Sequence, residues 1–270
     1  MNHLILLKLG GSLITEKSKP HTARLNTIHR IAYEIAASLK HQPGLKLVIG
    51  HGSGSFGHVP AHLYHTRQGV TSREQWRGYA EVWHEARLLN QIVLESFYSA
   101  GLPVIAFPPS ACAVTTRGIV THWDLYGLQA ALQANLIPVV NGDVVIDQAL
   151  GGTIVSTEDV FGYLAPELKP ERILLAGLEP GVWADYPDCT RLHPIITPAD
   201  RDQISAGVSG SATVDVTGGM LDKVNHLLEL VQQIAHLEGM IFSGEGEGQI
   251  GQALSGASFG TVIRGMPEKE

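Results

Sequence analysis

The segment from Gly52 to Gly57 has the G-x-x-x-x-G spacing of a phosphate-binding loop, and it follows an apolar, β-branched run at residues 46–50. In a P-loop the next two residues are Lys and Ser or Thr, which contact the nucleotide phosphates and Mg²⁺. Here they are His58 and Val59. A P-loop NTPase is therefore a poor match. We interpret the segment as a loop whose backbone amides bind phosphate while a histidine contacts it.

Three other glycine-bearing segments lie where strands are expected to end or a helix to begin: Gly10-Gly11-Ser12, residues 177–181 and Thr217-Gly218-Gly219. Free amides and the helix dipole favour an anion at a helix N-terminus. Lys8 directly precedes the first of these segments, at the end of an apolar strand where an unpaired lysine is costly. Several phosphate-competent segments in one chain predict a ligand set with more than one phosphate.

The remaining charged candidates have strong structural alternatives. Lys17 and Lys223 are compatible with surface positions, although Lys223 lies four residues after Gly219 and so faces the first turn of the expected helix. Asp143 and Asp159 follow predicted strands, where carboxylates bind magnesium, orient lysines or cap helices. For Asp159 the capping role is a serious rival, because a Ser-Thr pair precedes it.

Two stripes of side chains at helical spacing have simpler explanations than a special site. The histidine stripe lacks a nearby carboxylate or cysteine to complete a metal-ligand set, so no metal site is expected there. The aromatic stripe favours core packing, with an apolar pocket wall as the alternative. The two sets are His58, His62 and His65, and Trp76, Tyr79 and Trp83.

Composition limits the class of protein. The chain has 270 residues, 44% of them hydrophobic and 17% charged, and a net charge of −7, which argues against nucleic-acid or membrane-surface partners. Its two cysteines exclude a disulfide framework and fit a cytoplasmic protein. The N-terminal segment is a poor signal peptide and a good buried strand, and no apolar run approaches the length of a membrane span.

Strand-like and helix-like segments alternate along the chain, which predicts a mainly parallel sheet with helices on both faces. The expected fold is α/β, a three-layer αβα sandwich formed by residues 1–270 as one domain, with a lobe boundary near residues 166–171. Strands are expected at 4–9, 46–50, 103–107, 137–141, 172–177, 239–244 and 260–265, and a hairpin at 143–147 and 152–156. Helices are expected at 26–40, 72–100, 123–135, 157–168, 218–236 and 249–254.

Together these segments resemble the amino acid kinase family, in order and over nearly the whole chain. KLGGSLITEK (8–17) resembles the opening lysine–glycine signature with its second lysine, and GHGSGSFGH (50–58) resembles the phosphate loop of the subgroup that acts on isopentenyl phosphate. NGDVVID (141–147) and STEDVFGYLA (156–165) resemble the central hairpin and the following helix. VDVTGGMLDKV (214–224) resembles the nucleotide-side motif, and residues 242–263 resemble the closing segment.

The resemblance implies that the γ-phosphoryl group of ATP is transferred, with Mg²⁺, to the phosphate of isopentenyl phosphate, an isoprenoid precursor. It implies an acceptor-binding lobe at about 1–168, a nucleotide-binding lobe at about 169–270, and no protein ligand for a metal. We also expect a homodimer. The implied catalytic residues are Lys8, Lys17, His58, Asp159 and Lys223, with Asp159 holding the lysines. The implied acceptor-binding residues are Gly52, Gly57, His58 and Thr157. The implied ATP-binding residues are Lys8, Gly10, Gly11, Ser12, Ser53, Gly219 and Lys223.

Departures from the family pattern leave some points open. Ser53 stands where a further glycine is frequent, Thr157-Glu158-Asp159 where Gly-Asp-Asp is frequent, and residues 178–182 lack both aspartates of Asp-x-Asp-Gly-Val. Donor preference is therefore open. Two alternatives keep the fold: a kinase for a phosphonate such as fosfomycin, and a non-catalytic nucleotide sensor. A dinucleotide-binding oxidoreductase is disfavoured, because no acidic residue ends a second strand about 20 residues after the glycines.

Overall fold

The computed structural model describes residues 3–208 and 219–266. Its strands are β1 (His3–Leu9), β2 (Leu45–His51), β3 (Val104–Ala106), β4 (Ala113–Thr116), β5 (Ile119–Trp123), β6 (Ile137–Asn141), β7 (Asp143–Asp147), β8 (Gly151–Val155), β9 (Arg172–Gly177), β10 (Ile195–Ile196), β11 (Glu238–Ser243) and β12 (Thr261–Arg264). Its helices are α1 (Gly11–Ile14), α2 (Leu25–His41), α3 (His58–Leu63), α4 (Arg73–Ser99), α5 (Pro109–Cys112), α6 (Tyr126–Gln133), α7 (Thr157–Leu168), α8 (Arg201–Val208), α9 (Met220–Gln233) and α10 (Gln249–Leu254). Short 3₁₀ helices lie at Thr66–Gln68 and Pro198–Asp200.

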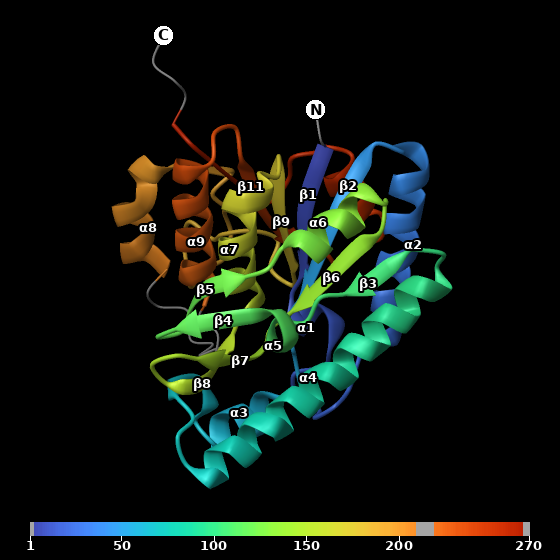
Figure 1. Ribbon diagram of the computed structural model, residues 1–270. Helices are drawn as coiled ribbons and strands as arrows, with labels where there is room; N and C mark the ends of the chain where they lie inside the picture. The colour runs from blue at the N-terminus through green and yellow to red at the C-terminus, as the bar shows by residue number, and fades with distance from the viewer. Residues whose placement is uncertain (1–2, 209–218, 267–270) are drawn as a thin grey trace.

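The main sheet has eight strands in the order β10-β12-β11-β9-β1-β2-β6-β3. Pairing is parallel from β11 to β3, and β12 runs antiparallel to β11. The central strand β1 pairs with β2 on one side and with β9 on the other, so the sheet continues across the expected lobe boundary (Figure 1). The predicted parallel α/β sheet is confirmed.

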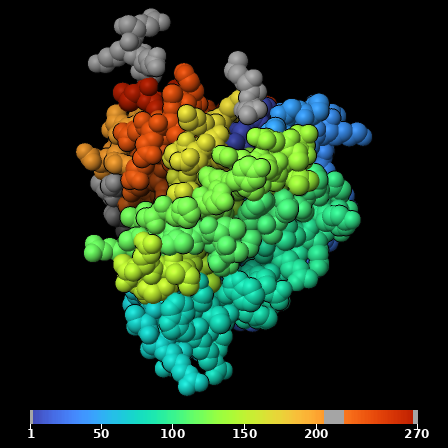
Figure 2. Space-filling view, viewed as in Figure 1, coloured from blue at the N-terminus to red at the C-terminus, as the bar shows by residue number. Residues whose placement is uncertain are grey.

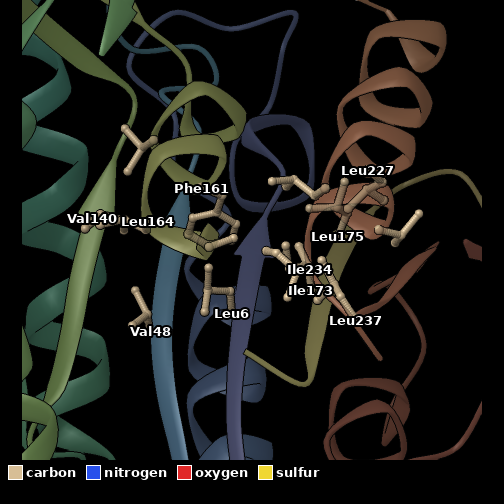
Figure 3. Close-up of a cluster of buried hydrophobic side chains, with 14 of the residues drawn as sticks. Leu6, Val48, Val140, Phe161, Leu164, Ile173, Leu175, Leu227, Ile234 and Leu237 are labelled. Atoms are coloured by element: carbon tan, nitrogen blue, oxygen red, sulfur yellow. The ribbon is translucent and has the colours of Figure 1, made fainter. Parts of the chain in front are cut away.

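Alternation along β1 decides which side chains face which layer of helices. Leu4 and Leu6 belong to a core with α6, α7, α8 and α9, and Figure 3 shows Leu6 beside Phe161 of α7. Ile5 and Leu7 belong to a second core with α1, α2, α4 and α10. The sheet thus has a helical layer on each face, as the sandwich prediction requires. Lys8 falls on the face of Leu6, toward α7.

A second, four-stranded sheet in the order β5-β4-β7-β8 lies beside the main one (Figure 1). The predicted hairpin of β7 and β8 is confirmed, whereas the β4–β5 hairpin was not predicted. The prediction of a helix from Trp123 was wrong, because Trp123 ends β5 opposite Ala113 and the helix begins at Tyr126. The β4–β5 turn depends on a distant carboxylate: Asp147 of β7 accepts hydrogen bonds from two consecutive turn amides.

Local capping motifs in the sequence explain where two of the flanking helices, α4 and α7, begin. Ser72 and Gln75 form a capping box that begins α4, and Ser156 and Asp159 form another that begins α7. In Figure 2, residues of α3 and α4, in cyan to green-blue, occupy the lower part of the visible face. Within the described residues, no helix is both long enough and apolar enough to cross a membrane.

Candidate active site

A cavity of about 530 Å³ opens at the carboxyl ends of β1, β2 and β9, the edge at which parallel α/β sheets bind ligands. It brings together most of the residues that the sequence singled out. The predicted residues that line it are Lys8, Gly10, Gly11, Ser12, Lys17, Gly52, Ser53, His58, Thr157, Gly219 and Lys223. Gly57 and Asp159 are not among its lining residues.

The first two glycine segments pack against each other through their backbones. A Cβ atom on Gly11 would lie 2.5 Å from the Gly54 nitrogen, so only glycine permits this approach. Thr15 joins the same two segments, because its hydroxyl donates to the Gly11 carbonyl at 2.8 Å and accepts from the Ser55 amide at 2.8 Å. Two loops that are about 40 residues apart in sequence therefore form one continuous surface of amides.

Lys8 is buried, and its amine forms an ion pair with Glu158 of α7. This contact follows from the β1 alternation that directs Lys8 toward α7. Burial alone raises the pKa of Glu158, but the nearby Lys8 and Lys223 outweigh that effect and hold the pKa below its usual value. Glu158 thus interacts electrostatically with two of the predicted catalytic lysines.

Asp159 lies elsewhere, and this corrects the expectation that it holds the lysines. Its carboxylate accepts from the Ser156 amide at 2.7 Å and lies 3.5 Å from Arg67. Successive helical residues differ by about 100° in direction. When Asp159 caps the helix, Glu158 is the residue directed at Lys8. The sequence offered a signal for this, since Glu158 belongs to the same Ser-Thr-Glu-Asp motif.

His58 is the first residue of α3 and lines the cavity, as expected for a histidine that begins a helix after a glycine loop. Gly57 precedes it with φ of 79°, a left-handed conformation that favours glycine. Gly57 therefore sets the direction of His58 and does not itself face the cavity. Thr157 begins α7, and its hydroxyl donates to the carbonyl of His51 at 2.7 Å, so its backbone amide is the better candidate for a ligand contact.

The other half of the cavity includes the predicted segment at 177–181. Its Leu178 and Glu179 follow β9, where the family's aspartates are absent, and Glu179 accepts from the Trp183 indole at 2.9 Å. Sequence analysis missed Trp183, Tyr186 and Cys189, which also line this end. No spacing pattern identified these aromatic and sulfur side chains. Residues 214–218 of the predicted motif at 214–224 lie outside the described residues.

The remaining candidates lie away from the cavity lining. Asp143 is buried and accepts from the Ser110 and Val144 amides, and burial raises its pKa to about 6. Tyr79 packs on a small apolar cluster that contains Val144, as the core interpretation of the aromatic stripe expects. The same interpretation is wrong for Trp76 and Trp83, which are 38% and 40% exposed. Among the described residues, no group of three or more His, Cys, Asp or Glu side chains is arranged to hold a metal ion.

Comparisons with known proteins agree with this geometry. Residues 3–243 match the model of the amino acid kinase family. The chain is 32% identical to isopentenyl phosphate kinase of Methanocaldococcus jannaschii over 96% of this chain and 98% of that protein. It is also 32% identical to isopentenyl phosphate kinase of Methanothermobacter thermautotrophicus, over 97% and 99%.

A solved structure of an isopentenyl phosphate kinase superposes with a TM-score of 0.82 at 30% identity, covering 97% of this chain and 100% of that one. The family match spans every strand of the two sheets except β12, and every segment that lines the cavity. The chain therefore belongs to the amino acid kinase family.

Proposed function

We propose that this protein transfers the γ-phosphoryl group of ATP to isopentenyl phosphate, giving isopentenyl diphosphate and ADP. The observation that carries the proposal is one cavity lined by three lysines, two interlocked glycine loops and His58. Several relatives that match over their full length are named for this reaction. The proposed site needs no covalent intermediate, because phosphoryl transfer depends mainly on positioning and charge stabilisation.

In the proposed reaction, an oxygen of the acceptor phosphate forms a bond to the γ-phosphorus of ATP, and the bond from that phosphorus to the β-phosphate oxygen breaks. The acceptor phosphate is already an anionic nucleophile, so no strong general base is required. His58 donates a hydrogen bond to it and orients it. Lys8, Lys17 and Lys223 stabilise the negative charge on the transferring group.

In this proposal, each half of the cavity binds one of the two substrates. Gly52, the Thr157 amide and His58 hold the acceptor phosphate, in the lobe at about 1–168. ATP binds along Gly10, Gly11, Ser12, Ser53 and Gly219, with its base toward the lobe at about 169–270. Glu158 takes the role first expected of Asp159 and orients the lysines.

Magnesium enters this proposal only as the counter-ion of ATP. Mg²⁺ retains several waters and binds mainly through phosphates in such sites. The Glu158 carboxylate in the cavity contacts Lys8, and Glu179 accepts from Trp183, so neither is an obvious metal ligand. We assign no protein ligand to the ion and derive no step through it.

Two further expectations stay proposals. The first is a homodimer, which light scattering would test. A cytoplasmic location is supported by Cys112 and Cys189, which form no disulfide.

The test is an ADP-release assay with ATP, Mg²⁺ and a panel of acceptors: isopentenyl phosphate, other small monophosphates, and fosfomycin. We expect the highest kcat/KM with isopentenyl phosphate, and a loss of about 10²-fold in His58→Ala, the usual scale for removing one anion-stabilising donor. His62→Ala is the matched control, because His62 lies on the same helix outside the cavity lining. Preference for fosfomycin, ATP binding without transfer, or normal kinetics in His58→Ala would each refute part of the proposal.

A further inference from the structure

The segment between α1 and α2 carries Lys17 to the cavity and then returns to the protein surface. An isolated bridge pairs Thr15 with Ala23, and the Glu16 amide donates to the Thr22 carbonyl at 2.9 Å. The segment is therefore a closed loop held at its base. Lys17 lies near the tip of this loop. Its position therefore depends on the contacts made by the residues that lead back from the tip to Ala23.

His21, one of these residues, makes the contacts. Its amide donates to the Ser55 carbonyl at 3.3 Å, and its ring stacks on Phe56 with centroids 5.6 Å apart and an interplanar angle of 27°. Its Nε2 lies against the Glu85 carboxylate of α4, and the two form an ion pair when the ring is protonated. The Glu85 side chain is only 16% exposed, whereas that of His21 is 52% exposed. One histidine thus joins the Lys17 loop, the phosphate loop and a long helix.

The backbone of His21 is held in a costly conformation. Its φ of 51° is left-handed, which is uncommon for a residue other than glycine. Such strain persists where surrounding contacts determine the geometry, and it concentrates at functional sites. By contrast, the Glu16–Lys19 ion pair on the same loop has side chains 41% and 66% exposed, and it joins only residues of the loop itself.

We propose that His21 is a positioning residue for phosphoryl transfer. Its contacts with Ser55, Phe56 and Glu85 fix the loop that presents Lys17 relative to the loop that presents His58. Lys17 is four residues before His21, and His58 is two residues after Phe56, so each joined segment carries one group of the proposed site. The inference rests on the proposed function. A small displacement of a charge-stabilising group is costly because its effect depends on geometry.

The first test is His21→Asn. Asparagine tolerates the left-handed conformation but lacks the ring that reaches Phe56 and Glu85. We expect kcat to fall about tenfold while the KM of the acceptor changes less than about twofold, because Lys17 acts on the transferring group. Glu85→Gln keeps the shape and removes the charge, and should lower kcat by about threefold. Glu16→Gln is the control and should leave kcat unchanged.

The second test separates positioning from a general structural role. In a Lys17→Met background, measured by single-turnover ADP formation, His21→Asn should change the rate less than about twofold, because the group it positions is gone. An equal loss in both backgrounds, or full kcat in the single variants, would overturn the inference. Both variants are measured with an acceptor from the panel that the wild-type protein phosphorylates. If the wild type does not phosphorylate isopentenyl phosphate but does phosphorylate another acceptor, the proposed function is refuted, and the positioning role of His21 is still tested with that other acceptor.

Discussion

The ion pair between Lys8 and Glu158 gives the sharpest test of how the site is assembled. We consider Glu158→Gln, which keeps the size of the side chain and removes its charge. The Lys8 and Glu158 side chains are 9% and 12% exposed, so the substitution leaves a nearly buried ammonium without its carboxylate. Removing one partner of a buried pair costs about 3–5 kcal/mol. Because both residues line the cavity, solvent can reach the remaining charge, and we expect the lower end, about 3 kcal/mol.

The same substitution should affect catalysis, since the carboxylate lies near both Lys8 and Lys223. We expect kcat to fall by about 10²-fold or more, the scale for losing one preorganised electrostatic contact. The free energy of unfolding is measured by urea titration, and kcat by ADP release with saturating ATP and acceptor.

Asp159→Asn is the control for that experiment. Asp159 caps α7 and lies 3.5 Å from Arg67, with neither side chain fully buried. Its substitution should cost about 1 kcal/mol of stability and change kcat less than about threefold. If Asp159→Asn lost more activity than Glu158→Gln, or if Glu158→Gln had wild-type stability and kcat, the assignment of Glu158 would be wrong.

Three further predictions test the surroundings of the site. Burial raises the pKa of Asp143 to about 6 from 3.8, so the folded state holds a proton that the unfolded state has lost between about pH 4 and 6. Wild-type stability relative to Asp143→Asn should therefore fall as pH rises through that window, by about 3 kcal/mol at pH 7, as urea titrations at several pH values would reveal; a constant difference would contradict this. Asn90→Leu removes the partner 3.0 Å from Nε2 of the buried His51, and should cost about 1–3 kcal/mol of unfolding free energy; an unchanged urea midpoint would show that the contact is dispensable. Gly11→Ala places a Cβ 2.5 Å from a backbone nitrogen and should lower kcat/KM by at least about tenfold, whereas Gly44→Ala, with no atom within 4 Å of its Cβ, should have no effect; equal effects in the two variants would refute the packing argument.

The sequence alone identified the family and most of the cavity. Glycine segments after apolar strands, with Lys8 at the end of β1, indicated a site for more than one phosphate, because glycine amides and a strand-end lysine suit few other ligands. The boundaries of α7 and β9 were predicted without error, since a Ser-Thr cap and a β-branched, apolar run are local signals. These features require only neighbouring residues, so one sequence is enough to recognise them.

The tertiary structure decided which residues meet. Glu158, not Asp159, contacts Lys8, because the capping of α7 fixes the direction of each side chain and β1 presents Lys8 to that helix. The β4–β5 hairpin depends on Asp147, which lies about 30 residues away. His21 meets Phe56 and Glu85 only after the chain has folded. Such contacts join residues distant in sequence, and no local pattern encodes their distance or direction.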